Sequence, residues 1–260
     1  MLALTPENYY SREADREYWS ASQAKSFLSC PARAMAELNG DFVRPAGTAL
    51  LVGSFVDAFF EGTLPDFIVQ HPELFKRDGV TLKADYIKAM EMIDRAKQDE
   101  LFMEYMEGEK QRIVTGEIGG LPFKGKFDVY KAGERIVDLK TAKDLQPMYK
   151  PGEGRLSFAD YWNWPLQMAI YQALEGNRLP CYLAVITKED PPDIALVEIE
   201  QEKLDAEMDF LLEKLPYFDA IKQGIIEPDR CENCAWCRMS RKLTAPRPLE
   251  SYIEIGGDYE

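Results

Sequence analysis

The sequence lacks any apolar run that approaches the roughly 18 residues needed to span a bilayer. Its first residues also lack the charged and apolar regions of a signal peptide. Cysteine is scarce, and five, an odd number, do not suggest the paired framework of a secreted disulfide protein. Together these absences predict a cytoplasmic protein that does not enter a membrane.

Basic residues are also in short supply, with 31 Lys and Arg against 45 Asp and Glu and a formal net charge of -14. This balance argues against a protein that coats nucleic acid non-specifically, because phosphate binding needs basic side chains. It does not exclude a nuclease, because bound divalent cations add positive charge at the site itself. Residues 124–155 depart from the trend, with eight basic and five acidic side chains, a net charge of +3.

The order of periodic segments predicts an α/β layer arrangement with a mixed central sheet, in a single domain over residues 1–260. We expect a helical part over 20–110, a central part over 111–200, and a helix with a cysteine-rich tail over 201–260. Predicted helices cover 20–40 with a break at Pro31, 47–61, 81–107 facing solvent, 157–175 capped by Ser157 and kinked at Pro165, and 201–223. Predicted strands cover 111–118, 121–130, 135–141, 180–187 and 194–199.

The stretches Gly-Lys-Phe-Asp128 and Val-Asp138-Leu-Lys140-Thr141 lie on two neighbouring predicted strands. Side chains alternate along a strand, so Asp138 and Lys140 project from one face, and Asp128 lies within reach across the pair. Two carboxylates and an ammonium suit phosphodiester hydrolysis, since carboxylates hold Mg²⁺ or Mn²⁺ and a lysine can orient or deprotonate water and stabilise developing charge. Taken alone, an Asp-x-Lys on a strand is more often an ordinary surface ion pair.

Together with Gln167-Met-Ala-Ile-Tyr171, these motifs resemble the RecB-like branch of the PD-(D/E)xK nuclease superfamily. The pattern is most similar to the exodeoxyribonuclease VIII-like proteins of phages and covers roughly residues 20–240. The resemblance implies a restriction-endonuclease-like αβββαβ core and a metal-dependent DNA nuclease, with an exonuclease favoured over an endonuclease. It also implies that the partners are DNA, other copies of the chain in a closed ring, and a single-strand annealing protein of phage recombination.

By the same resemblance, Asp128 and Asp138 are metal ligands, Lys140 is the catalytic lysine, and Gln167 and Tyr171 organise the site. The branch usually carries a histidine ligand on an early helix, and here Asp57 stands at that place. Asp57 is therefore the third predicted ligand for Mg²⁺ or Mn²⁺.

Two further residues lie outside these motifs. The lone histidine, His71, sits in a Gln-His-Pro-Glu stretch typical of an exposed loop. Glu117 is a further candidate carboxylate, and an exposed strand position explains it equally well.

Cys231, Cys234 and Cys237 offer three thiolates at two-residue spacing, enough to wrap one metal ion or one face of a cluster. The stretch that ends in Cys30-Pro31 resembles the upstream motif of iron–sulfur RecB-like nucleases, in which one early and three late cysteines ligate a 4Fe-4S cluster. The last two cysteines are closer together here than in those nucleases, so structural Zn²⁺ and three free thiols stay open as alternatives. Cys181 begins an apolar strand and is predicted to be a core residue.

A second function stays open beside the nuclease: a catalytically inactive DNA-binding or assembly module with the same fold. The acidic surface and the missing histidine favour it. The complete Asp128–Asp138–Lys140 set argues against it, because burying clustered carboxylates without a metal is costly.

Overall fold

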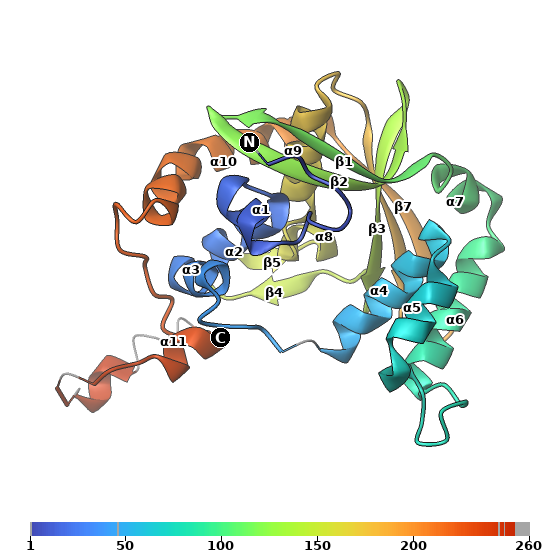
Figure 1. Cartoon of the computed structure of the whole chain (residues 1–260), viewed down its shortest axis with the longest axis horizontal. Coiled ribbons are helices and arrows are strands. Elements are labelled where there is room, and N and C mark those ends of the chain that lie inside the picture. The colour runs from blue at the N-terminus through green and yellow to red at the C-terminus, as the bar shows by residue number, and fades with distance from the viewer. Residues whose placement is uncertain (1, 46, 244, 247, 253–260) are drawn as a thin grey trace.

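The computed structural model describes residues 2–45, 47–243, 245–246 and 248–252, so the last eight residues of the predicted tail lie outside it. Its centre is a mixed sheet in the order β1-β2-β3-β6-β7 (Figure 1). Strands β3 and β6 run parallel, and the other neighbours are antiparallel. The strands are β1 (Glu109–Ile118), β2 (Leu121–Lys131), β3 (Arg135–Ala142), β6 (Cys181–Thr187) and β7 (Ile194–Ile199), with a separate hairpin of β4 (Met148–Lys150) and β5 (Gly154–Leu156). The predicted mixed α/β architecture is confirmed.

Helices cover both faces of this sheet (Figure 1). They are α1 (Arg12–Glu17), α2 (Ala21–Ser29), α3 (Pro31–Asn39), α4 (Thr48–Glu61), α5 (Leu64–Gln70), α6 (Ala84–Lys97), α7 (Glu100–Tyr105), α8 (Phe158–Tyr161), α9 (Trp164–Glu175), α10 (Gln201–Lys222) and α11 (Ala235–Met239). Among the described residues, no helix has the length and apolar content that crossing a membrane requires.

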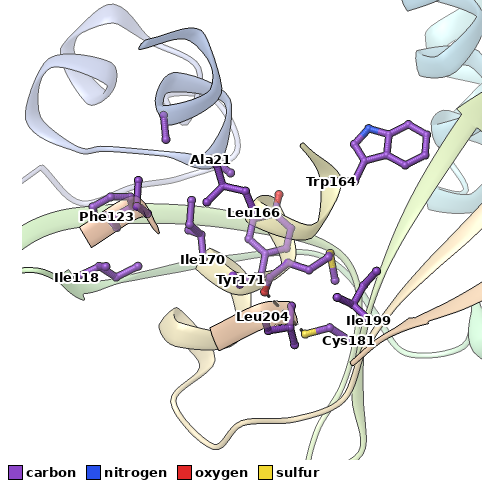
Figure 2. Close-up of a cluster of buried hydrophobic side chains, with 14 of the residues drawn as sticks. Ala21, Ile118, Phe123, Trp164, Leu166, Ile170, Tyr171, Cys181, Ile199 and Leu204 are labelled. Carbon is purple, nitrogen blue, oxygen red and sulfur yellow. Dashed lines mark hydrogen bonds between the residues drawn. The ribbon is translucent and has the colours of Figure 1, made fainter. Parts of the chain in front are cut away.

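Two apolar cores fill the space between helices and sheet. On one face, α2, α9 and α10 pack against the sheet around residues such as Phe123, Ile170 and Leu204 (Figure 2). On the other face, α4, α6 and α7 pack against the alternate strand positions, including Val137 and Leu139. Alternation along β3 therefore sends Val137 and Leu139 into one core and leaves Asp138 on the opposite face.

The helix ends follow the predicted signals. Ser20 Oγ accepts a hydrogen bond from Gln23 N at 3.2 Å, which caps α2. Only half of the capping box forms, because the Gln23 side-chain oxygen accepts a hydrogen bond from Lys222 Nζ and not from Ser20 N. Pro31 begins α3 where its missing N–H costs nothing, and Gly40 ends that helix in the left-handed conformation, with φ +85°.

Two helix predictions were wrong. Residues 81–107 form α6 and α7 rather than one helix, and α6 is not a solvent-facing helix, because Tyr86, Ala89 and Ile93 are buried in the second core. Pro165 does not kink a long helix but lies in the first turn of α9, after a break at Asn163, which has φ +51°. Ser157 does cap the preceding short helix, as predicted.

The sheet opens at one point, between β2 and β3. Their pairing is limited to Val129–Val137, Tyr130–Ile136 and Lys131–Arg135, close to the turn that joins them. Beyond Val129 the two strands have no ladder pairs. The backbone groups at that edge need other partners, and a side chain supplies one of them.

Candidate active site

Asp128 stands on β2 at the residue where its pairing with β3 stops. Its Oδ2 accepts a hydrogen bond from Leu139 N at 2.9 Å and so replaces a missing ladder bond. Its Oδ1 accepts from Gln111 Nε2 at 3.2 Å. The carboxylate thus links β2 to β3 at a point where the two backbones no longer pair.

Asp138 and Lys140 project from the same face of β3, as the alternation predicts. Asp138 is only 1% exposed and forms an ion pair with the Lys140 ammonium through Oδ2. That oxygen is buried and accepts no hydrogen bond of regular geometry among the described residues. Burial alone would lower the pKa of Lys140, but Asp138 and Asp128 outweigh it and the pKa is raised. Lys140 therefore stays protonated at neutral pH.

Gln167 and Tyr171 lie one turn apart on α9 and face this strand (Figure 2 shows Tyr171 among the core side chains). Gln167 Nε2 donates to Asp138 Oδ1 at 2.8 Å and to the Tyr171 hydroxyl at 3.1 Å. Lys25 Nζ on α2 donates to Gln167 Oε1 at 2.8 Å. The glutamine is held on both sides of its amide, which fixes the orientation of the Asp138 carboxylate.

Asp57 reaches the same place from α4. The helix packs close to β3 at Gly53, where a Cβ would lie 3.4 Å from Thr141 Oγ1. Asp57, one turn further along, lines a cavity of about 540 Å³ together with Asp128, Asp138 and Lys140. Residues from α2, α4, β2, β3 and α9 thus meet around one opening, and the structure brings together every residue predicted for the catalytic site.

Burial is the main cause of the altered titration of these carboxyl groups. It raises the pKa of Asp57 to about 7, with Lys140 opposing the rise and Asp138 and Glu61 adding to it. It also raises the pKa of Asp128 well above its ordinary value, and the neighbouring Asp138 adds to that rise. Neighbouring carboxylates repel one another when both are ionised, and a bound cation would stabilise their ionised form.

The lining therefore fits a divalent metal ion such as Mg²⁺ or Mn²⁺. Its donors are carboxylate oxygens, which these hard cations prefer. Asp138 Oδ2 is a buried carboxylate oxygen that contacts the Lys140 ammonium and has no regular hydrogen-bond donor among the described residues. The residues that would hold the ion are Asp57, Asp128 and Asp138. The Lys140 ammonium supplies one positive charge beside these carboxyl groups.

Sequence reasoning missed several residues of the site. Gln111 departs from strand geometry with φ +53°, and its buried Oε1 has no hydrogen-bond partner in the described residues. Tyr9 and Tyr10, which precede the region covered by the family resemblance, line the cavity. No pattern in the sequence marks any of these positions, and Lys25 reads as one polar residue of an amphipathic helix.

The basic surplus of residues 124–155 is only partly available at the site. Lys124 is buried and paired with Asp15 at 2.7 Å, and the Arg135 guanidinium is buried and bonded to Glu104 O at 2.6 Å. Lys126 and Lys140 line the cavity. The net charge of +3 for residues 124–155 therefore overstates the positive charge available at the site, because Lys124 and Arg135 are engaged in structural contacts.

Glu117, the additional candidate carboxylate, and His71 lie apart from the cavity. Glu117 is an exposed residue near the tip of the β1–β2 hairpin and does not line the cavity. His71 pairs with Glu73 at 2.8 Å, between α5 and α6. Neither residue joins the carboxylate set.

The four cysteines Cys30, Cys231, Cys234 and Cys237 come together, with their sulfurs all within 4.8 Å of one another. This group could hold a zinc ion or an iron–sulfur centre. Cys181 is buried in the core, as predicted, and lies outside the group.

The sequence profile of a family described as "PDDEXK-like domain of unknown function (DUF3799)" matches residues 20–240. The chain belongs to this PDDEXK-like family. The carboxylates, lysine and opened strand pair described above lie within the matched region.

Solved structures include a strong match to this PDDEXK-like chain. The crystal structure of a "Putative exonuclease" from Eubacterium rectale is 39% identical, with a TM-score of 0.93 over 97% of this chain and 98% of that chain. The crystal structure of SSO0001 aligns with 73% of this chain and 85% of its own at 15% identity, and its TM-score of 0.31 supports no argument. None of the curated proteins compared with the chain matches it.

For the DNA hydrolysis proposed below, replacing Lys25 by methionine is expected to lower turnover roughly 10-fold to 100-fold, the cost of one lost charge-assisted hydrogen bond. The Gln167 amide would lose its anchor and hold Asp138 less firmly, so kcat should fall while KM for DNA changes little. Lys25→Arg should recover part of the rate.

Lys222 offers a matched control for Lys25. Like Lys25, it is a half-buried lysine whose pKa burial lowers to about 8, but it donates to Tyr18 O and Gln23 Oε1 away from the cavity. Lys222→Met should reduce stability and leave kcat near the wild-type value. Equal loss of kcat in both variants would mean that Lys25 acts only on stability.

Below the Asp57 pKa of about 7, the affinity for Mn²⁺ is expected to rise with pH by at least about tenfold per unit, since Asp57 and Asp128, whose pKa is also raised, must lose protons to bind the ion. A protonated carboxyl group cannot bind a cation, so metal and proton compete for Asp57.

The stability of the metal-free chain should depend on pH in the opposite direction to its Mn²⁺ affinity. Because the folded pKa lies above the ordinary 3.8, the free energy of unfolding should fall as pH rises from about 4 through about 7. Titration calorimetry and denaturant unfolding between pH 5.5 and about 8.5 measure both, and a flat Mn²⁺ affinity would contradict the expectation.

Proposed function

We propose that the chain is a metal-dependent DNA nuclease that hydrolyses phosphodiester bonds, that it acts as an exonuclease rather than as an endonuclease, and that the whole chain forms one nuclease domain. The observation that carries this proposal is the meeting of Asp128, Asp138 and Lys140 where β2 and β3 separate. The family assignment and the 39% identical structure described as an exonuclease support it.

A divalent ion bound by Asp57, Asp128 and Asp138 would polarise the phosphoryl group and lower the pKa of a bound water. The protein's own groups then divide the remaining work. Lys140, on the same face of β3 as Asp138, would orient the attacking water and stabilise negative charge on phosphate oxygens. Gln167 holds Asp138, and Lys25 holds Gln167.

DNA entry to the site has support in the cavity lining. Lys126 adds a cation at the opening, close to the ring of Tyr10 at 4.7 Å from its centroid. An aromatic ring and an ammonium beside the reacting groups can stack a base and contact a phosphate. DNA is therefore the proposed substrate, although the chain as a whole is acidic.

The test is digestion of end-labelled linear duplex DNA with Mn²⁺ or Mg²⁺, beside single-stranded and closed-circular DNA. Mononucleotide or short products from linear DNA, with circular DNA intact, would support an exonuclease, and cleavage of circles would support an endonuclease. If the folded, metal-supplied chain leaves all three substrates intact but binds DNA, the inactive binding module replaces the enzyme.

A further inference from the structure

The spacing of the four cysteine sulfurs is that of ligands to one atom. Cys30 Sγ lies 3.6 Å from Cys237 Sγ and 3.8 Å from Cys234 Sγ, and Cys231 Sγ lies 4.0 Å from Cys237 Sγ. A tetrahedral ion with metal–sulfur bonds of about 2.3 Å places its sulfurs roughly 3.8 Å apart. The observed distances bracket that value.

A four-iron cluster requires a wider arrangement of the same residues. Each thiolate binds a different iron, and the iron–thiolate bonds point away from the centre, so the sulfurs stand roughly 6 Å apart. Here all four lie within 4.8 Å of one another. Cys30 and Cys237 are fully enclosed, with Ala32 and Trp236 packed around them, so the sulfurs cannot move outward without displacing α3 or α11.

Backbone groups around the sulfurs are arranged to stabilise thiolates. Cys234 N donates to Cys231 Sγ at 3.3 Å, and Cys237 N donates to Cys234 Sγ at 3.4 Å. The turn between the first two cysteines needs Glu232 at φ +59°, and Arg230 ties it to Cys237 O at 2.7 Å. This polar scaffold is typical of a built metal site rather than of free thiols in a loose tail.

We infer that Cys30, Cys231, Cys234 and Cys237 form a closed structural site for one tetrahedral Zn²⁺ ion, and that the chain does not carry a four-iron, four-sulfur cluster. This departs from the cluster that the sequence resemblance implies. Zinc is the expected ion because four thiolates close its coordination shell and leave no position for a substrate. The inference does not depend on the nuclease proposal.

The site joins segments that lie far apart in the sequence. Cys30 stands at the junction of α2 and α3, and the other three ligands surround the start of α11, so the C-terminal segment is fastened to the N-terminal helices (Figure 1). Because α2 also carries Lys25, the ion fixes one end of the helix whose side chain holds Gln167. Its proposed role is to support that helix, and it takes no part in catalysis.

The experiment is metal and sulfide analysis of the full chain, produced in cells supplied with both zinc and iron and purified without oxygen. We expect about one zinc per chain, no acid-labile sulfide and no broad visible absorption. Co²⁺ exchanged into the site should give the visible bands of tetrahedral thiolate coordination. About four irons with four sulfides per chain would overturn the inference, as would one iron without sulfide or a metal-free chain with oxidised cysteines.

Cys234→Ser and Cys181→Ser form a matched pair of variants. Cys181 is buried but bonds only carbonyl oxygens, Met168 O and Leu179 O, so its variant should keep one zinc per chain. Cys234→Ser should lose most of the zinc and melt at a lower temperature. If Cys234→Ser proves insoluble, the metal and sulfide content of the wild-type chain still decides the question.

Discussion

Replacing Asp138 by alanine should lower the proposed DNA hydrolysis by about 10³-fold or more, because the variant loses a proposed metal ligand and leaves two partners without their acceptor. Asp138 pairs with Lys140 and accepts a hydrogen bond from Gln167 inside the site. Lys140→Ala should cost about 10² to 10³-fold, the usual loss for one group that stabilises transition-state charge. Rates on end-labelled linear duplex in saturating Mn²⁺ measure both losses.

The control for these two variants is Lys143→Ala. Lys143 follows β3 directly, yet its side chain is 92% exposed, so its replacement should change the rate by no more than a few-fold. The double variant Asp138→Ala/Lys140→Ala should be little worse than Asp138→Ala alone, since the residues act as a unit. Wild-type rates in folded Asp138→Ala and Lys140→Ala would place the chemistry elsewhere in the chain.

The parts of this site that sequence could predict are those encoded within one or two adjacent elements. Asp128, Asp138 and Lys140 lie on consecutive strands joined by a short turn, so alternation and register bring them together. Lys25 lies 142 residues from Gln167, and no local period connects α2 to α9. Such long-range pairs are decided by how the helices pack on the sheet, which the polar pattern of one helix does not reveal.

Two other outcomes show where local patterns carry too little information. In α6, the buried face consists of Tyr86, Ala89, Ile93 and Ala96. Two of these residues are alanines, which give a weak hydrophobic signal among the charged residues around them, so the sequence pattern did not indicate burial. At the cysteines, two-residue spacing is compatible with either a single ion or a cluster. The distances between sulfurs from both ends of the chain distinguish them, and those distances exist only after folding.

Replacing Asp57 by alanine should weaken Mn²⁺ binding by about 100-fold or more, because Asp57 is the one predicted ligand that approaches the cavity from α4 rather than from the sheet. Without it the ion would keep ligands on one side only. The pH dependence of Mn²⁺ binding assigned above to Asp57 should also flatten near pH 7. Titration calorimetry at pH 6 and pH 8 measures both effects, and Asp66→Asn, an exposed carboxylate on α5, is the control expected to bind as the wild type does.

Asp57→His would test why a carboxylate stands where related nucleases are expected to carry histidine. Imidazole is a poor ligand for Mg²⁺ but binds softer divalent ions, so Asp57→His should retain more activity with Mn²⁺ than with Mg²⁺, whereas the wild type should use both. A neutral imidazole also removes one of the buried negative charges that raise the pKa of Asp128, so ionisation of Asp128 should become easier. Wild-type Mn²⁺ affinity in Asp57→Ala would show that the ion is held by the strand carboxylates alone, and Asp57 would then be a buried acid that shapes the cavity without binding metal.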